Sequence, residues 1–218
     1  MKVGILFDMD GTVLNTIEDL ADSVNASLAH YGYPERTLDE VRRFVGNGVR
    51  RLMRQAVPET ATDAQMEEVL RFYQTYYEEH CQIKTRPYDG IVEILQQLCK
   101  RYPVAIVSNK PDGAVKILAA QYFPGVYALG ESPACPRKPA PDMVFQAMKA
   151  LEVDACIYVG DSEVDVLTAK NAQVPCLSVT WGFRDVPELE EAGAKYFCHD
   201  TAKLQESLDA IVSEIYGQ

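Results

Sequence analysis

The feature that most constrains the fold is a short apolar run near the start of the chain that leads directly into two aspartates. Residues 3–7 (VGILF) form the run, and residues 8–12 (DMDGT) follow it. An apolar run of this length, bounded by polar residues and glycine, predicts a buried strand. Ionised carboxylates are costly to bury unless they are paired, hydrogen-bonded or bound to a metal. Because ligands of open parallel sheets bind beyond the carboxyl ends of the strands, Asp8 and Asp10 are predicted to lie at a functional site.

After these aspartates the pattern of the chain changes twice. Apolar residues recur at helical spacing through residues 16–84, whereas short apolar runs alternate with helical segments from residue 90 onward. In the first block, helices are expected over residues 17–31, 38–45, 49–56 and 63–80. Strands are expected at residues 3–7, 104–107, 126–129, 156–159, 176–179 and 195–197, with helices at 90–101, 112–122, 141–151, 163–172 and 201–214.

This order of elements indicates an α/β protein. Strands that alternate with helices predict a Rossmann-like, doubly wound parallel sheet. The helical block after the first strand is too long to be a loop of a compact domain, so it is interpreted as an inserted all-helical cap domain. We expect residues 1–15 and 86–218 to form the core and residues 16–85 to form a cap over the carboxyl edge of the sheet.

The net charge of the chain bears on its partners, and its cysteines bear on its compartment. The net charge of −11 at pH 7 disfavours nucleic acid and anionic membranes as partners. No apolar stretch approaches membrane-spanning length, and the run at residues 3–7 is too short for a signal peptide. The six cysteines are scattered without a C-x-x-C pair, which favours a reducing compartment. We therefore expect a cytoplasmic protein, either a monomer or a homodimer.

Further polar clusters follow other apolar segments of the predicted core. They are Ser108-Asn109, Lys138, and Asp161 with Asp165. If all of them lie at one sheet edge, the carboxylates can hold a hard cation such as Mg²⁺, and the lysine and hydroxyl groups can hold a phosphate. A carboxylate can also attack phosphorus and form an aspartyl-phosphate.

With these motifs the sequence resembles the haloacid dehalogenase superfamily, and within it the phosphoglycolate-phosphatase-like group. The run Asp8-Met9-Asp10-Gly11-Thr12 is similar to the family's DxDGT motif. Ser108-Asn109 matches its second motif, Lys138 the third, and residues 160–165 (GDSEVD) the acidic fourth. Four motifs in the family's order make the resemblance specific, and it covers essentially the whole chain.

The resemblance implies a role for each motif residue. Asp8 would be the nucleophile, Asp10 the general acid and then base, and Lys138 the group that neutralises charge on Asp8 and the phosphate. Asp8, Asp161 and the backbone carbonyl of Asp10 would bind Mg²⁺, with Asp165 orienting the metal shell or Lys138. The phosphoryl group would be bound by Thr12, Ser108, Asn109 and Lys138. For Ser108 and Asn109 a helix N-cap is the alternative role. For Asp165 the alternative is to cap its helix or to place a negative charge at the start of that helix.

The predicted cap carries a segment, residues 45–52, that resembles a cap loop-and-helix segment of phosphoglycolate phosphatases. Gly46 and Gly48 permit a tight loop, and the backbone N–H groups of Gly46, Asn47 and Gly48 could meet an anionic tail at the start of a helix. Arg50 is the candidate for an added positive charge, with Arg51 and Arg54 as alternatives that the sequence does not separate.

The hypothesis from sequence is a Mg²⁺-dependent phosphatase that hydrolyses a small phosphorylated metabolite through an aspartyl-phosphate. By resemblance, 2-phosphoglycolate is the leading substrate. The alternatives are a pyrophosphatase, a nucleotidase, and a sugar-phosphate phosphatase or mutase of the same superfamily. A non-catalytic binding module on this fold is the alternative from a different class, and the intact set of Asp8, Asp10, Lys138 and Asp161 argues against it.

Overall fold

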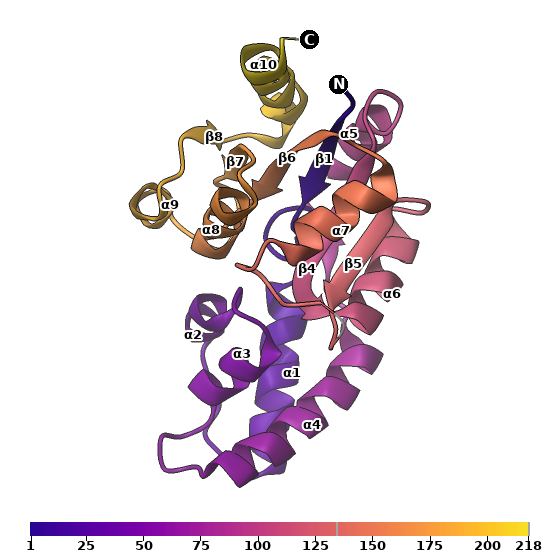
Figure 1. Ribbon diagram of the computed structural model, residues 1–218. Helices are drawn as coiled ribbons and strands as arrows, with labels where there is room; N and C mark the ends of the chain where they lie inside the picture. The colour runs from indigo at the N-terminus through magenta and orange to yellow at the C-terminus, as the bar shows by residue number, and fades with distance from the viewer. Residues whose placement is uncertain (134, 218) are drawn as a thin grey trace.

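The core of the protein is a parallel β-sheet, seen in a computed structural model that describes residues 1–133 and 135–217 (Figure 1). Its strands are β1 (Val3–Phe7), β4 (Val104–Pro111), β5 (Tyr127–Glu131), β6 (Ala155–Gly160), β7 (Cys176–Val179) and β8 (Tyr196–Cys198). In the described part of the chain these six strands lie in the order β5-β4-β1-β6-β7-β8, and all neighbouring pairs are parallel. The predicted doubly wound sheet is confirmed.

Strand β1 lies at the centre of the sheet, and its register determines which residues meet at the sheet edge. Phe7 is paired with Ile106 on one side and with Val159 on the other. The next residue continues the ladder, because the Asp8 amide donates to the Val159 carbonyl at 2.8 Å. The segments that follow β1 and β6 therefore leave the sheet side by side, as expected where the strand order reverses.

Helices cover both faces of the sheet, which explains why β1 is apolar at every position. One face is covered by α7 (Asp142–Leu151) and α8 (Glu163–Ala172), and the other by α5 (Ile91–Leu98), α6 (Asp112–Tyr122) and α10 (Leu204–Tyr216). Side chains of β1 alternate between the two faces, with Ile5 and Phe7 in one hydrophobic cluster and Leu6 in the other. All three side chains are fully buried, and each large apolar side chain buried in this way contributes about 1.5–3 kcal/mol.

The chain between β1 and α5 contains four helices, and they lie beyond the carboxyl ends of the strands (Figure 1). They are α1 (Ile17–His30), α2 (Leu38–Phe44), α3 (Val49–Ala56) and α4 (Asp63–His80). Capping boxes begin α2 at Thr37 and α4 at Thr62, where the side chain of each threonine accepts a backbone hydrogen bond. The buried rings of Tyr73 and Tyr77 lie on the inner face of α4.

The insertion is connected to the core through two short strands that the sequence did not predict and that form a separate small sheet. β2 (Leu14–Asn15) and β3 (Arg86–Pro87) pair antiparallel where the chain leaves and re-enters the core. Two-residue strands carry no periodicity, so only the spatial meeting of distant segments reveals them. The remaining elements are α9 (Val186–Ala192) and a 3₁₀ turn at Thr201–Lys203. Nowhere in the residues described is a helix long and apolar enough to cross a membrane.

Several predicted boundaries were wrong by a few residues. β4 runs to Pro111, past the expected end at 107, because β5 also extends and Pro111 pairs with Glu131 after a register shift. β8 covers 196–198 instead of 195–197. α5 ends at Leu98, three residues early, shortly before a proline at 103 that a helix does not easily approach. The final helix begins at Leu204 and runs to Tyr216.

Candidate active site

A cavity lies between the carboxyl edge of the sheet and the inner faces of α1, α3 and α4. Its polar wall comes from the sheet side, and its apolar wall comes from the helical insertion. The sheet side contributes Asp8, Asp10, Ser108, Asn109, Lys110, Lys138, Asp161 and Arg184. The insertion contributes Leu20, Val45, Gly46, Gly48, Val49, Leu52, Tyr73 and Tyr77. The cavity therefore combines charged groups capable of chemistry with a surface that excludes water.

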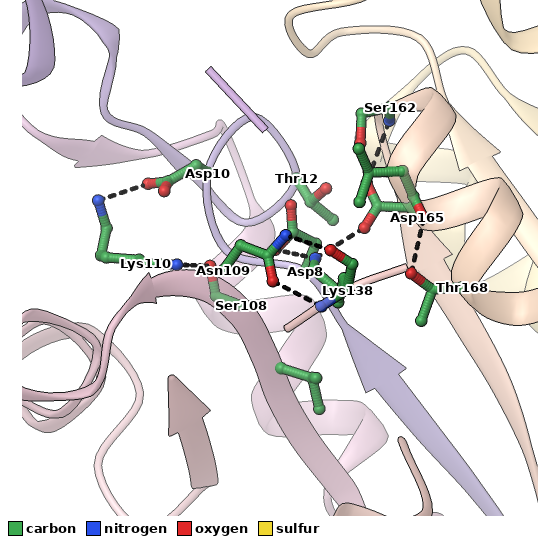
Figure 2. A network of polar contacts seen from close by, with 12 residues as sticks. Asp8, Asp10, Thr12, Ser108, Asn109, Lys110, Lys138, Ser162, Asp165 and Thr168 are labelled. Atoms are coloured by element: carbon green, nitrogen blue, oxygen red, sulfur yellow. Dashed lines mark hydrogen bonds and ion pairs between the residues drawn. The ribbon is translucent and has the colours of Figure 1, made fainter. Parts of the chain in front are cut away.

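Lys138 is the cation at the centre of the polar wall (Figure 2). Its Nζ lies 2.7 Å from Asp8 Oδ1 and 2.8 Å from Asp165 Oδ1, and it donates to the Tyr158 hydroxyl at 3.0 Å. Burial alone lowers the pKa of Lys138, but the adjacent carboxylates of Asp165 and Asp8 outweigh burial and raise it well above its ordinary value. Lys138 is thus a permanent positive charge beside Asp8.

Asp161 is held in one orientation by backbone and side-chain donors. Its Oδ1 accepts from the Thr12 hydroxyl at 3.0 Å, and its Oδ2 accepts from the Phe183 amide at 2.7 Å. Gly11 and Gly182 approach it so closely that a Cβ at either position would collide with the Asp161 carboxyl. The glycine of the DGT motif is therefore needed to let the chain pass Asp161, and the Thr12 side chain orients that carboxyl.

Three buried carboxylates converge where a cation would fit. Asp8, Asp161 and Asp165 each offer an oxygen, and these oxygens lie within 4.8 Å of one another. Burial raises the pKa of Asp8 to about 7, with Asp165 and Asp10 adding to the rise and Lys138 opposing it. Burial, then the charges of Asp165 and Asp8, also raise the pKa of Asp161 well above its usual range.

The donor set suits a hard cation. Asp8 Oδ1 is buried and receives no hydrogen bond, since its contact with Lys138 is an ion pair outside hydrogen-bond geometry. When all three carboxyls are ionised, they and one lysine leave a net charge of −2 in this buried site, which a divalent cation would balance. Oxygen ligands of this kind are those preferred by Mg²⁺ and Ca²⁺.

Asp165 has a different environment from Asp8 and Asp161. Its Oδ2 accepts from the Ser162 amide at 3.1 Å and from the Ser162 hydroxyl at 2.6 Å, while its Oδ1 meets Lys138. Asp165 thus both caps the start of α8 and orients Lys138, so the two roles considered from sequence coexist. With both oxygens engaged, its carboxylate has less freedom to ligate a cation directly.

Asp10 lies apart from this cluster and faces the other side of the cavity (Figure 2). Its Oδ1 accepts from the Thr16 hydroxyl at 2.7 Å and lies 2.9 Å from Lys110 Nζ. Lys110 is buried and also donates to the Tyr77 hydroxyl of α4. The sequence analysis missed Lys110, although its position directly after the Ser108-Asn109 motif was a signal that could have pointed to it.

Asn109 supports the site by binding backbone groups of other segments, whereas the Ser108 hydroxyl accepts from the Lys110 amide at 3.3 Å. The Asn109 side chain accepts from the Lys138 amide at 2.8 Å and donates to the Lys138 carbonyl at 2.9 Å, so it clamps the segment that carries the lysine. It also donates to the Gly46 carbonyl of the insertion at 3.1 Å. Neither residue caps a helix, because α6 begins at Asp112 with Pro111 as its N-cap and has no side-chain capping bond.

The predicted substrate residues of the insertion separate into two groups. Gly46 and Gly48 line the cavity, whereas Asn47 and Arg50 do not. Asn47 donates weakly to Glu163 at 3.4 Å, and the Arg50 side chain is 57% exposed and paired with Glu67 of α4. The structure therefore does not bring Arg50 to the site. The inner face of α3 is formed by its apolar residues, and Arg50 projects from the outer face.

Arg184 is the arginine that lines the cavity among the described residues, and it comes from the loop after β7 instead of from the helical insertion. Its Nε donates to Glu163 at 2.9 Å, and its Nη atoms donate to the carbonyls of Arg42 and Val45 at 3.1 and 2.7 Å. These carbonyls lie at the end of α2, where a positive charge is favourable. Arg184 thus ties the insertion to the sheet, a contact that no local sequence signal announces.

Comparisons with known proteins agree on one family. The family described as haloacid dehalogenase-like hydrolase matches residues 5–179. A phosphoglycolate phosphatase of Pseudomonas aeruginosa is 32% identical over 204 residues, covering 86% of this chain and 73% of the relative. One of Agrobacterium fabrum is 33% identical over 195 residues, covering 85% and 83%. A crystal structure from Lactobacillus delbrueckii subsp. bulgaricus superimposes with a TM-score of 0.88 at 36% identity, over 94% of this chain and 97% of that one.

Proposed function

This chain belongs to the haloacid dehalogenase-like hydrolases and is a phosphatase, and from that premise we propose that it hydrolyses 2-phosphoglycolate to glycolate and phosphate. The observation that carries the proposal is the meeting of Asp8, Lys138 and Asp161 in one buried site at the carboxyl edge of the sheet. The substrate itself is proposed because the similar curated proteins of two bacteria carry that activity in their names.

Asp8 is the proposed nucleophile. One of its carboxylate oxygens attacks phosphorus, the bond from phosphorus to the ester oxygen breaks, and the phosphoryl group remains on Asp8 as an acyl phosphate. Lys138, held at 2.7 Å from Asp8, offsets the repulsion between the carboxylate and the incoming phosphoryl group. Asn109 maintains this geometry because it clamps the backbone of Lys138.

Asp10 is the proposed proton carrier. It gives a proton to the leaving ester oxygen, so that glycolate departs as an alcohol. It then accepts a proton from the water that attacks phosphorus, which frees phosphate and restores the Asp8 carboxylate. Thr16 and Lys110 hold the Asp10 carboxyl at the cavity wall, so this role requires a turn of the side chain toward the reacting oxygen.

We propose Mg²⁺ as the cation and Asp8 and Asp161 as its carboxylate ligands, with the Asp10 carbonyl as a further ligand. The cation would supply positive charge that screens the phosphate from the carboxylates. Asp165 orients Lys138 in this arrangement, and Thr12 orients Asp161. Ser108 and Asn109 lie at the same wall of the cavity, where a phosphoryl group would be held.

We further propose that residues 16–85 act as a cap domain on a core of residues 1–15 and 86–218. The cavity lies between these two parts, so a movement of one against the other would change access to it. Closure would exclude water from the acyl phosphate. The paired strands β2 and β3 lie at the junction and are suited to serve as the hinge.

The test is phosphate release from 2-phosphoglycolate by the purified protein with Mg²⁺, and again after treatment with EDTA. A panel containing pyrophosphate, a nucleoside monophosphate and a hexose phosphate measures preference as kcat/KM. Asp8→Asn is expected to abolish release, while Asp22→Asn, an exposed carboxylate paired with Lys84, serves as the matched control and retains it. Rapid quenching should recover a phosphorylated peptide that contains Asp8.

Three results contradict the proposal. A higher kcat/KM for another member of the panel contradicts the substrate. Full activity after EDTA treatment contradicts the metal. Turnover by Asp8→Asn, or conversion of a hexose phosphate to an isomer without phosphate release, contradicts the mechanism.

A further inference from the structure

We infer that Lys110 and Tyr73 form the subsite for a second anionic group of the substrate, a carboxylate carried one carbon away from the ester oxygen. The inference rests on the proposed function and assigns the specificity to residues outside the family motifs. It also replaces the cap arginine that the sequence suggested, since Arg50 lies outside the cavity.

The charges that line the cavity leave one candidate for an anion beside the reacting phosphate. Among the described residues that line it, the cations are Lys110, Lys138 and Arg184, and none comes from the helical insertion. Lys138 is committed to ion pairs with Asp8 and Asp165 and to a hydrogen bond with the Tyr158 hydroxyl, all within 3.0 Å of its Nζ.

Arg184 is committed in the same way. Its guanidinium bonds Glu163 and three backbone carbonyls at the end of α2, those of residues 42, 43 and 45. Recruiting it to a ligand would break the contacts that tie the insertion to the sheet. Lys110 is the remaining cation with donor capacity to spare.

Lys110 has a free donor and a buried position. Its ammonium carries three N–H groups, and the described partners are Asp10 at 2.9 Å and the Tyr77 hydroxyl. Nζ also lies 4.5 Å from the centre of the Tyr77 ring, and the side chain is only 1% exposed. A charge-assisted hydrogen bond in such a dry setting is stronger than one at the surface.

Tyr73 supplies the second observation. Its hydroxyl is buried at the cavity wall and has no hydrogen-bond partner among the described residues. An orphaned buried hydroxyl is costly, and such a group in a native structure calls for a partner. The Tyr73 ring is parallel to that of Tyr77, with centres 5.5 Å apart, so it lies beside the tyrosine that contacts Lys110.

Both tyrosines remain donors at neutral pH. Burial raises the pKa of Tyr73 and of Tyr77 well above the ordinary value, so neither hydroxyl ionises. Tyr77 accepts from Lys110, which leaves its own proton free to donate. The wall therefore presents one ammonium and two hydroxyl donors, and such a set recognises a carboxylate.

The position of Lys110 next to Asp10 matches the shape of the substrate. In 2-phosphoglycolate a single methylene joins the ester oxygen to the carboxylate. The group that binds the carboxylate must therefore be adjacent to the group that protonates the ester oxygen, and Lys110 is in direct contact with Asp10. The ammonium would also keep the substrate carboxylate from being repelled by the Asp10 carboxyl.

The test compares 2-phosphoglycolate with ethyl phosphate, in which a methyl group replaces the carboxylate. The measured quantity is the selectivity ratio, kcat/KM for 2-phosphoglycolate divided by kcat/KM for ethyl phosphate. Lys110→Met is expected to lower this ratio about ten- to a hundred-fold, the loss of a hydrogen bond to a charged group. Tyr73→Phe should lower the ratio about ten-fold through KM. This variant loses only one oxygen atom, so it still tests the subsite if Lys110→Met fails to fold. Lys116→Met, an exposed lysine paired with Asp112, is the matched control and should leave the ratio unchanged.

The outcomes separate this inference from the proposed function. If Lys110→Met lowers both kcat/KM values equally, Lys110 acts only through Asp10 and the subsite is refuted, while the proposed function stands. An unchanged ratio in Tyr73→Phe likewise refutes the subsite, as does a ratio that falls in Arg50→Met instead. If the wild-type protein does not prefer 2-phosphoglycolate over ethyl phosphate, the proposed substrate itself is refuted before any variant is made.

Discussion

Removing the positive charge of Lys138 should destabilise the fold as well as the chemistry. The side chain is 2% exposed and lies within 2.8 Å of carboxylate oxygens of both Asp8 and Asp165. Lys138→Met leaves three buried carboxylates with no cation, and breaking a buried ion pair from one side costs about 3–5 kcal/mol. For a chain of this size that cost corresponds to a fall in Tm of roughly 6–20 °C.

The loss of stability should depend on pH in a defined direction. The pKa of Asp8 is raised from 3.8 to about 7 even though Lys138 opposes the rise, so in the variant it rises further. The native variant then binds more protons than the unfolded chain between these values, and its stability falls as pH increases from about 4 through 7. The deficit should therefore be larger at pH 8 than at pH 5.

The assay is urea unfolding in EDTA, for wild type and variant, at both pH values. Lys116→Met is the control, since an exposed ion pair contributes about 1 kcal/mol or less. Adding Asp165→Asn to Lys138→Met removes one of the unpaired charges and should recover part of the loss, so the two changes are not additive. A free energy of unfolding for Lys138→Met within about 1 kcal/mol of wild type at pH 8 would refute the reasoning, because that is no more than an exposed pair contributes.

Three further predictions concern the metal, the acid and the contact between the two parts of the chain. Mg²⁺ should raise Tm more at pH 8 than at pH 5, because a pKa of about 7 leaves Asp8 protonated at the lower pH; an equal rise in a thermal shift assay contradicts this. Asp10→Asn should slow turnover of an alkyl phosphate about 10²–10⁴-fold, and p-nitrophenyl phosphate much less; equal losses would remove its role as acid. Arg184→Met should lower the free energy of unfolding by about 1–3 kcal/mol and speed proteolysis near residue 45. Unchanged stability and an unchanged digestion rate would show that this contact does not stabilise the protein.

Much of the architecture was predictable because each signal is local. The first strand is apolar at every position since helices cover both faces of the sheet, and that pattern is visible in residues 3–7 alone. The order of strands and helices predicted the doubly wound sheet, and the family assignment from the four motifs is confirmed. Boundaries were less predictable, because the extension of β4 to Pro111 depends on its pairing with Glu131 of another strand.

Motif residues could be assigned to a common edge because parallel register carries them there. Asp8 and Asp161 each come shortly after one of two strands that pair at Phe7 and Val159, so their proximity follows from strand ends alone. A role for Arg50 was inferred from its place in a loop-and-helix segment, but the face on which a helical side chain projects depends on which neighbours pack against it. Its ion pair with Glu67 belongs to the packing of α3 on α4.

Lys110 and Arg184 show where local patterns stop being informative. Each is a single basic residue in a loop or strand end, and each acquires its meaning from partners roughly 30 to 140 positions away in the chain, such as Tyr77 and the Val45 carbonyl. The sequence by itself thus determines the secondary structure and the chemistry of the motifs, because both depend on residues that are near one another in the chain. Which cation meets the substrate tail depends on how the insertion folds back over the sheet, because burial and long-range contact set the charge balance of the cavity.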